Sequence, residues 1–354
     1  MGYICREAKN DMKIAVTGVG GGVGQSIMKA LQLASIPIQI YPIDINPLSA
    51  GLYRGTKSSV LPKPEKPENL KVWEEWLLEN KIDALIPGSD HDLLPLAGIR
   101  DEWDKRDICR VLISDKELIE TGHDKALTNK KFTDAGILAP KSIWNINIEE
   151  AINWAGTTGY PIILKPRVSS SSRHLHIIYD EEELSFYFPR TPNPILQEYL
   201  HWEGKTFEYT CSVFVDNKSK IIGTFMAKRD LIAGSTYRAE INYWPEIDVL
   251  IKAIANLLIP RGPINIQLRQ TEKGPMPFEI NTRCSGTTAI RAYFGYNEPE
   301  MLIRNFVLEE ELSPPISRNG YVFRYWNEIF LDGVSEEQLI AGDIEHTGKV
   351  IGWP

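Results

Sequence analysis

The sequence begins with a short apolar run, a glycine cluster and a helical pattern, an order that few folds can accommodate. The apolar run covers residues 13–17, the glycines lie between Gly18 and Gly24, and the helical pattern covers residues 25–33. A strand that turns through glycine into a helix is typical of the first βα unit of a doubly wound parallel sheet. We therefore expect an α/β protein whose first domain, residues 1–114, contains a Rossmann-like parallel sheet.

The glycine cluster leaves two interpretations open. Its spacing resembles that of short-chain dehydrogenases, and Asp44 follows about twenty residues later, where a dinucleotide ribose would be held. Those enzymes also need a Tyr-x-x-x-Lys motif on a later helix, whereas the instance at residues 53–57 comes too early in the chain. The cluster therefore predicts either an anion contact or a tight turn. An NAD(P)-dependent reductase is one alternative function.

A short acidic segment follows the strand expected at residues 82–86. Asp90, His91 and Asp92 then lie at the carboxyl end of a parallel sheet, where ligands collect. Their spacing permits a metal site, but the start of a helix before the apolar residues 93–96 explains them as well. We favour the start of a helix.

Length, charge and cysteines limit the class of protein. A chain of 354 residues is long enough for about two or three domains. The net charge of −8 and the lack of long runs of like charge argue against a nucleic-acid partner. The four cysteines are far apart, so we expect no zinc site or disulfide framework, and a cytoplasmic location is the simpler one. No apolar run approaches the roughly 18 residues that cross a bilayer, so we expect no membrane partner.

Two strands expected at residues 261–269 and 275–283 predict a metal site. Side chains two residues apart leave the same face of a strand, so Glu279 and Asn281 point the same way. Antiparallel pairing across the turn between the strands brings Gln267 close to Glu279. A carboxylate and two amide oxygens suit Mg²⁺, which takes its remaining ligands from water and substrate phosphates.

Several other groups in the sequence can bind phosphate. Arg283 follows on the same face and can balance the charge of a phosphoryl group. Lys165 closes an apolar strand and needs an anion, since burying it unpaired is costly. The hydroxyl-rich residues 167–174 form either a loop that closes over phosphates or a solvated hairpin loop. Because Lys165 precedes them, we favour the phosphate loop.

Six blocks in this order resemble the ATP-grasp superfamily, and within it the carbamoyl phosphate synthase large-chain-like carboxylate–amine ligases. The blocks are Asp124-Lys125, residues 162–166, residues 196–200, Glu208-Tyr209, residues 265–269 and residues 278–283. The resemblance covers about residues 13–310 and implies an α+β ATP-grasp domain after the Rossmann-like one. It places a small lid subdomain at 115–198, a C-terminal subdomain with the magnesium site at 199–312, and a tail at 313–354 that packs on the body or on a partner.

The resemblance also implies roles for individual residues. The residues implied to bind ATP are Lys125, Lys165, Ser169, Ser170, Ser171, Ser172, Glu198, Tyr199, Leu200 and Glu208. Of these, the two lysines contact phosphates, residues 198–200 bind the adenine, and Glu208 holds the ribose, with Glu203 as an alternative. Gln267, Glu279 and Asn281 are implied to ligate Mg²⁺, with Mn²⁺ also possible, while Arg283 and Lys165 act on the transferred phosphoryl group. The loop at residues 168–172 departs from the family because it contains no glycine.

The resemblance implies an ATP- and Mg²⁺-dependent ligase. A carboxylate would attack ATP to give an acyl phosphate, and an amine, often that of an amino acid, would capture it, with release of ADP and phosphate. Cys284 is expected to be a packing residue rather than a thioester former. A non-catalytic nucleotide-binding protein stays open as a second alternative, and the aromatic tail allows a homodimer.

Overall fold

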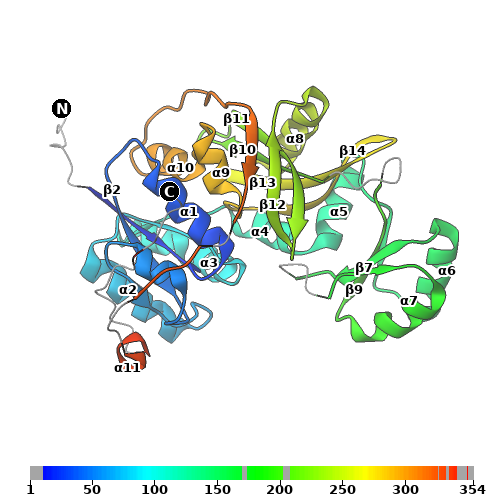
Figure 1. Cartoon of the computed structure of the whole chain (residues 1–354), viewed down its shortest axis with the longest axis horizontal. Helices are drawn as coiled ribbons and strands as arrows, with labels where there is room; N and C mark the ends of the chain where they lie inside the picture. Colours follow the sequence, from blue (N-terminus) through cyan, green and yellow to red (C-terminus); the bar gives the residue numbers. More distant parts are fainter. Residues whose placement is uncertain are drawn as a thin grey trace.

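The computed structural model describes residues 11–169, 174–201, 208–325, 327–331, 335–340 and 349. These residues form three sheets, arranged as an N-terminal unit, a central sheet and a lid (Figure 1). In this part of the chain, no helix is both long and apolar enough to cross a bilayer.

The N-terminal unit is a doubly wound parallel sheet, as expected. Its strand order is β3-β2-β1-β4-β5. The strands are β1 (Met12–Val16), β2 (Ile38–Asp44), β3 (Ser59–Val60), β4 (Ala84–Ile86) and β5 (Arg110–Val111). The helices are α1 (Gly22–Gln32), η1 (Ala50–Arg54), α2 (Pro67–Asn80) and α3 (Asp90–Lys105). The strands are apolar along most of their length because helices cover both faces of such a sheet.

The glycine cluster forms the tight turn between β1 and α1. Gly18 has a φ of +61°, a conformation that few other residues adopt easily. A Cβ on Gly24 would lie 2.5 Å from the carbonyl oxygen of Gly18. The N–H of Gly20 donates to the Asp44 carboxylate at 2.7 Å. Turn geometry and an internal carboxylate therefore account for these glycines.

The lid is a four-stranded antiparallel sheet with its own apolar core. The strand order is β6-β9-β7-β8. The strands are β6 (Ser142–Trp144), β7 (Ile162–Pro166), β8 (His176–Ile178) and β9 (Pro194–Glu198), and the helices are α6 (Ile148–Thr158), α7 (Glu181–Tyr187) and η2 (Phe188–Arg190). The helices α4 (Lys116–His123) and α5 (Lys125–Asp134) join the lid to the N-terminal unit.

The central sheet has six antiparallel strands in the order β14-β13-β10-β11-β12-β15. They are β10 (Glu208–Val215), β11 (Ile221–Ile232), β12 (Ser235–Ile241), β13 (Gly262–Thr271), β14 (Gly274–Asn281) and β15 (Gly320–Phe323). One face packs against α8 (Pro245–Leu258). Part of the other face shares a single apolar core with the N-terminal unit, α9 (Thr288–Tyr293) and α10 (Glu298–Phe306). The tail contributes β15 to this sheet, and α11 (Glu336–Ile340) follows it.

A buried ion pair ties α9 and α10 to the central sheet. Arg291 and Glu298 are both fully buried, with 2.6 Å between Nη1 and Oε1. Glu298 also accepts hydrogen bonds from the hydroxyls of Ser212 and Thr288. Arg291 donates in turn to Asn265 on β13 at 2.5 Å. The pair therefore fixes the helices beneath the strands that carry the metal-ligand candidates.

Removing one charge of this pair should strongly destabilise the protein. In Glu298→Gln the Arg291 guanidinium stays buried without a counter-charge, and we expect a loss of about 3–5 kcal/mol in the free energy of unfolding. Urea unfolding followed by circular dichroism measures this loss. Glu272→Gln, in the exposed turn between β13 and β14, is the matched control and should change little. A loss of less than about 1 kcal/mol in Glu298→Gln contradicts the assigned role.

Candidate functional site

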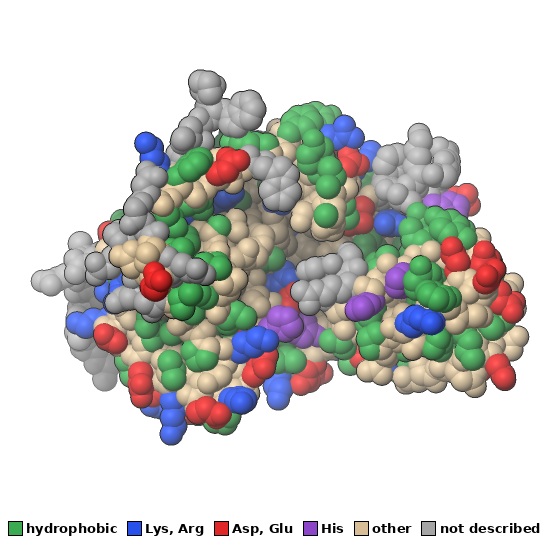
Figure 2. Space-filling model, turned by 60° about the horizontal axis from the view of Figure 1, so that its bottom comes forward, with side chains coloured by type: hydrophobic (Ala, Val, Ile, Leu, Met, Phe, Trp, Pro, Cys, Tyr) green, Lys and Arg blue, Asp and Glu red, His purple; other side chains and the backbone are tan. Residues whose placement is uncertain are grey.

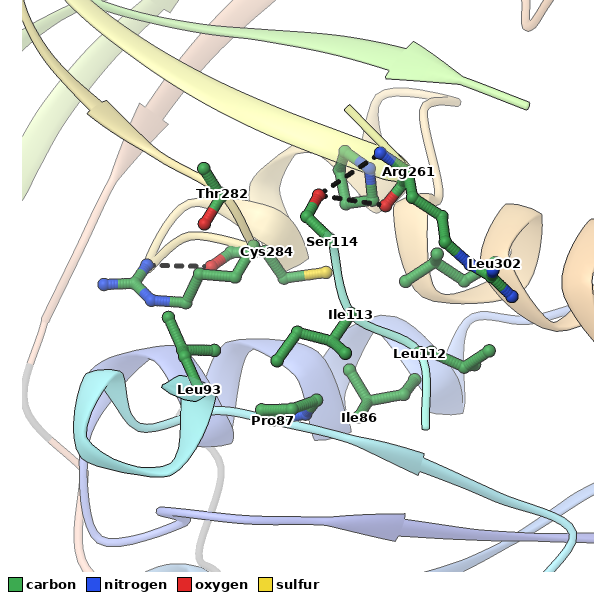
Figure 3. A pocket seen from close by; sticks show the side chains of 12 residues that line it. Ile86, Pro87, Leu93, Leu112, Ile113, Ser114, Arg261, Thr282, Cys284 and Leu302 are labelled. Carbon is green, nitrogen blue, oxygen red and sulfur yellow. Dashed lines mark hydrogen bonds between the residues drawn. The ribbon is translucent and has the colours of Figure 1, made fainter. Parts of the chain in front are cut away.

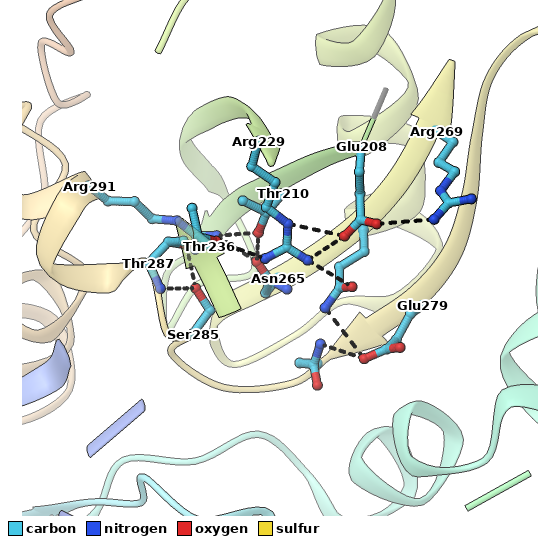
Figure 4. Close-up of polar contacts among 12 residues, drawn as sticks. Glu208, Thr210, Arg229, Thr236, Asn265, Arg269, Glu279, Ser285, Thr287 and Arg291 are labelled. Atoms are coloured by element: carbon cyan, nitrogen blue, oxygen red, sulfur yellow. Dashed lines mark hydrogen bonds and ion pairs between the residues drawn. The ribbon is translucent and has the colours of Figure 1, made fainter. Parts of the chain in front are cut away.

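The predicted metal ligands lie on one face of the β13–β14 hairpin. Gln267 is directly opposite Glu279, and Asn265 is opposite Asn281. Glu279 Oε1 lies 3.4 Å from Gln267 Nε2 and 3.3 Å from Asn281 Nδ2, and Figure 4 shows these contacts. The structure therefore brings together all three residues that were expected to hold Mg²⁺.

The donor set fits Mg²⁺ with few protein ligands. It offers one carboxylate and two amide oxygens, and the described residues contain no cluster of three His, Cys, Asp or Glu side chains that could hold a metal on their own. Mg²⁺ prefers oxygen ligands and usually keeps waters and phosphate oxygens in its shell. Glu279, Gln267 and Asn281 therefore fit an ion that arrives together with a nucleotide.

Arg229 is a further neighbour of this site. Its Nη2 lies 3.1 Å from Gln267 Oε1 and 2.5 Å from Glu208 Oε1. By sequence alone, Lys228-Arg229 and Arg238 could form either a solvated basic face or a phosphate or substrate-carboxylate contact. The β10–β11 register places Arg229 opposite Glu208, and its side chain is only 10% exposed. Gln267 Oε1 accepts one hydrogen bond from Arg229, so its second lone pair is still available to a metal ion.

Two lysines approach Glu279 from the lid side. Lys165 is 5% exposed at the end of β7, and burial lowers its pKa to about 8, although nearby Glu279 opposes the shift. Burial also lowers the pKa of Lys125, again against Glu279. Lys125 Nζ donates to the carbonyl oxygen of Ser169 at 2.9 Å. The other serines of the expected phosphate loop, residues 170–172, lie outside the described residues.

The expected adenine-binding segment follows β9. The Glu198 carboxylate accepts from the N–H of Lys141 at 2.9 Å, and the carbonyl oxygen of Leu200 accepts from Arg269 at 3.3 Å. The Arg269 guanidinium lies 5.8 Å from the Tyr199 ring and 5.7 Å from a second aromatic ring, that of Phe278. This arginine was not expected at the site.

Glu208, the expected ribose ligand, pairs with Arg229 and also with Arg269, whose Nη2 lies 3.5 Å from its second oxygen. Two arginines hold the carboxylate in place, and it retains lone pairs for a hydroxyl group. The alternative, Glu203, lies outside the described residues.

Arg283 is bound to the N-terminal unit. Its Nε and Nη2 each lie 2.6 Å from Asp90 Oδ1, at the first residue of α3. Ser89 caps that helix by accepting from the N–H of His91, so residues 90–92 form the start of a helix, as we favoured. Asp92 is buried and accepts from Thr17 Oγ1 at 2.6 Å, and burial raises its pKa to about 6. No local sequence signal pairs Asp90 with Arg283.

A small cavity, which Arg283 helps to line, lies between the N-terminal unit and the central sheet (Figure 3). Its lining is mostly apolar and includes Cys284, Ile86 and Leu112. Burial raises the pKa of the Cys284 thiol, so the thiol stays protonated near neutral pH. This agrees with Cys284 as a packing residue.

A hollow separates the N-terminal unit and central sheet from the lid, and Figure 2 shows charged side chains within it.

The sequence and the fold of this chain are similar to those of known proteins. Residues 190–329 match a family model described as ATP-grasp in the biosynthetic pathway with Ter operon. The carbamoyl phosphate synthase large chain of Haemophilus ducreyi is 26% identical over 183 residues, which cover 48% of this chain and 17% of that protein.

Two solved structures resemble nearly the whole chain. One is the biotin carboxylase domain of Hydrogenobacter thermophilus 2-oxoglutarate carboxylase, with MgADP, ADP and bicarbonate. Its TM-score is 0.70 at 18% identity, and the match covers 88% of this chain and 74% of that chain. N5-carboxyaminoimidazole synthetase from Staphylococcus aureus, with ADP, has a TM-score of 0.67 at 15% identity and covers 89% and 81%.

The chain has the ATP-grasp fold. The predicted fold and the relation to carbamoyl phosphate synthase large chains are thereby confirmed. The MgADP and ADP of the similar structures agree with the expected ATP and Mg²⁺. The chain spans less than a fifth of the length of the Haemophilus ducreyi protein. The domain boundaries and the roles of single residues in the ATP-grasp site stay predictions.

The pKa of Lys165 predicts the pH dependence of nucleotide binding. Lys165 loses its proton at about pH 8 in the free protein, and a bound phosphate favours the charged form. Affinity for MgADP should therefore fall by up to about tenfold per pH unit above 8, with proton uptake on binding. Titration calorimetry from pH 7 to 9.5, in two buffers of different ionisation enthalpy, measures both the affinity and the proton uptake.

The variant Lys165→Met is the control. It should bind MgADP more weakly and without this pH dependence. Equal affinity of the wild type at all these pH values contradicts the assignment.

Proposed function

We propose that the chain is an ATP- and Mg²⁺-dependent ligase that joins a carboxylate to an amine through an acyl phosphate, with release of ADP and phosphate. The observation that carries the proposal is the placement of Glu279. This carboxylate lies between Gln267 and Asn281 on one strand face, while Lys125 and Lys165 face it from the lid.

The first step needs little covalent chemistry from the protein. Phosphoryl transfer is catalysed mainly by alignment and by stabilisation of spread negative charge. Lys125 and Lys165 would bind ATP phosphates, and Arg283 would hold the transferred phosphoryl group in the orientation that Asp90 gives it. Mg²⁺ held by Gln267, Glu279 and Asn281 would neutralise the phosphate oxygens.

The second step requires exclusion of water. An acyl phosphate hydrolyses unless the site is closed before the amine attacks. Lys125 contacts Ser169 at the start of the expected phosphate loop, so movement of this loop would also move a phosphate ligand. This link supports closure of the lid over bound nucleotide. The carboxylate and amine would be small molecules.

The NAD(P)-dependent reductase has weaker support. The N–H of Gly20 already donates to Asp44, and Asp92 lies close to both Asp44 and Asp90. A pyrophosphate at this turn would meet carboxylates instead of free N–H groups. A non-catalytic nucleotide-binding protein is the stronger second candidate, since the metal site contains a single carboxylate.

Substitution of Glu279 tests the ligase. Glu279→Gln should weaken Mg²⁺-dependent nucleotide binding by at least about tenfold and abolish ADP release, because the metal loses its only charged protein ligand. Coupled-enzyme detection of ADP, across a panel of small carboxylates and amino acids, measures the release. Glu272→Gln on the same hairpin is the control. Full activity in Glu279→Gln would exclude this metal site.

Thermal unfolding separates the alternatives. MgATP at about 100 times its dissociation constant should stabilise the protein by about 2.7 kcal/mol, whereas NADPH should not change the melting temperature. Stabilisation by NADPH alone would favour the reductase. Stabilisation by MgATP without ADP release for any acceptor pair would favour the non-catalytic protein.

A further inference from the structure

Three cations come close enough to influence one another, and one of them lies beside β15, the edge strand of the central sheet that is furthest from β14. They are Lys29 on α1, Arg54 on η1 and Arg324 just after β15. None of them was assigned to the nucleotide, and they come from segments far apart in the chain.

Strand register places Arg324 on the face that carries the candidate site. Arg229 is opposite Ala239, and Ala239 is opposite Val322. Arg324 follows Val322 by two residues, and its N–H donates to the carbonyl oxygen of Tyr237 at 2.8 Å. Side chains two residues apart leave the same face of a strand. Arg324 therefore shares a face with Arg229, which itself contacts Gln267.

The Arg324 guanidinium also reaches the loop that follows Arg283. It donates to the carbonyl oxygen of Gly286. Gly286 is open to space, since a Cβ built on it meets no atom within 4 Å. The Arg324 guanidinium therefore lies beside an open position of this loop, at Gly286, which follows Arg283 by three residues.

The N-terminal unit supplies the other two cations. Helix α1 packs on α9, where the N–H of Ala289 donates to Ser26 Oγ at 2.8 Å. Lys29 lies three residues after Ser26, and so on the same side of the helix. Burial lowers the pKa of Lys29, and the charges of Arg324 and Arg54 lower it further. Burial and the charge of Arg229 lower the pKa of Arg324.

Lys29, Arg54 and Arg324 differ from the arginines of the candidate site in having no carboxylate partner among the described residues. Arg229 pairs with Glu208, and Arg283 pairs with Asp90. Among the described residues, no carboxylate forms an ion pair with Lys29, Arg54 or Arg324. Like charges held together without a counter-charge repel one another, and an anion removes that cost.

We propose that Lys29, Arg54 and Arg324 form a subsite for a second anionic group of the substrate, a carboxylate or a phosphate remote from the reacting carboxylate. The inference rests on the proposed ligase, since it names the class of one substrate. The nucleotide's own phosphates do not fill this subsite. Lys125 and Lys165 act near β14, and β15 is five strands away in a sheet whose strands are about 4.8 Å apart.

Anion binding with simple probes tests the subsite. Succinate, acetate and inorganic phosphate are titrated into the full chain by calorimetry at equal ionic strength, with and without MgADP. Succinate or phosphate should bind the wild type, and Arg324→Gln should weaken that binding by about tenfold, the loss expected for hydrogen bonds to a charged group. Lys29→Gln removes a side chain that is itself exposed to solvent; it should weaken binding in the same direction and serves if Arg324→Gln does not fold.

Arg238→Gln is the matched control. Arg238 lies on β12, pairs with Asp230 and is 58% exposed. It is the neighbour of Ala239 in the strand, so its side chain leaves the opposite face of the sheet from Arg324. Anion binding should be unchanged in this variant.

Each outcome has one meaning. Preference for succinate over phosphate identifies a carboxylate, and the reverse identifies a phosphate. Equal anion affinity in the wild type, Arg324→Gln and Lys29→Gln, with MgADP binding intact, overturns the subsite and leaves the ligase standing. Failure of MgADP to bind the wild type overturns the ligase, and the titrations without nucleotide still decide the subsite.

Discussion

Alternation of side chains across the central antiparallel sheet is the constraint on which the rest of the structure depends. One face of β10, β11, β13 and β14 is apolar, because these strands share a core with α8. The residues between them then point to the opposite face, where Glu208, Gln267 and Glu279 meet. A shift of one residue in any of these strands would move its polar set into the core. The apolar core therefore fixes the geometry of the charged site.

The arginines and lysines near that opposite face differ in whether a carboxylate forms an ion pair with them. The arginines at positions 229, 283 and 291 each have a carboxylate partner at 2.6 Å or less. Burial lowers the pKa values of Lys125 and Lys165, and Glu279 opposes the shift of both. Paired arginines hold the framework in place, whereas the lysines are stabilised fully only when an anion arrives.

The sequence predicts those parts of the site that depend on local geometry. The placement of Gln267 opposite Glu279 follows from two short strands and one tight turn, and the structure confirms it. The pairing of Arg283 with Asp90 joins residues 193 positions apart and depends on how two units pack. The place of Arg324 likewise depends on which edge of the sheet receives β15. Strand alternation reveals register within a hairpin, but it carries no information on which distant segment faces it.

The apolar core shared by the N-terminal unit and the central sheet has a mechanical consequence. Met12 and Ile14 of β1 belong to the same cluster as Phe214 and Phe225 of the central sheet, whereas the lid has a separate core. The N-terminal unit and the central sheet are therefore held together by one core. Together they carry the candidate metal ligands, Arg283 and the cations near β15. The lid, which carries Lys165, packs around its own core and shares none of these contacts. In the proposed ligase, closure over a nucleotide would therefore move Lys165 relative to the candidate metal ligands and Arg283, whose positions relative to one another would not change.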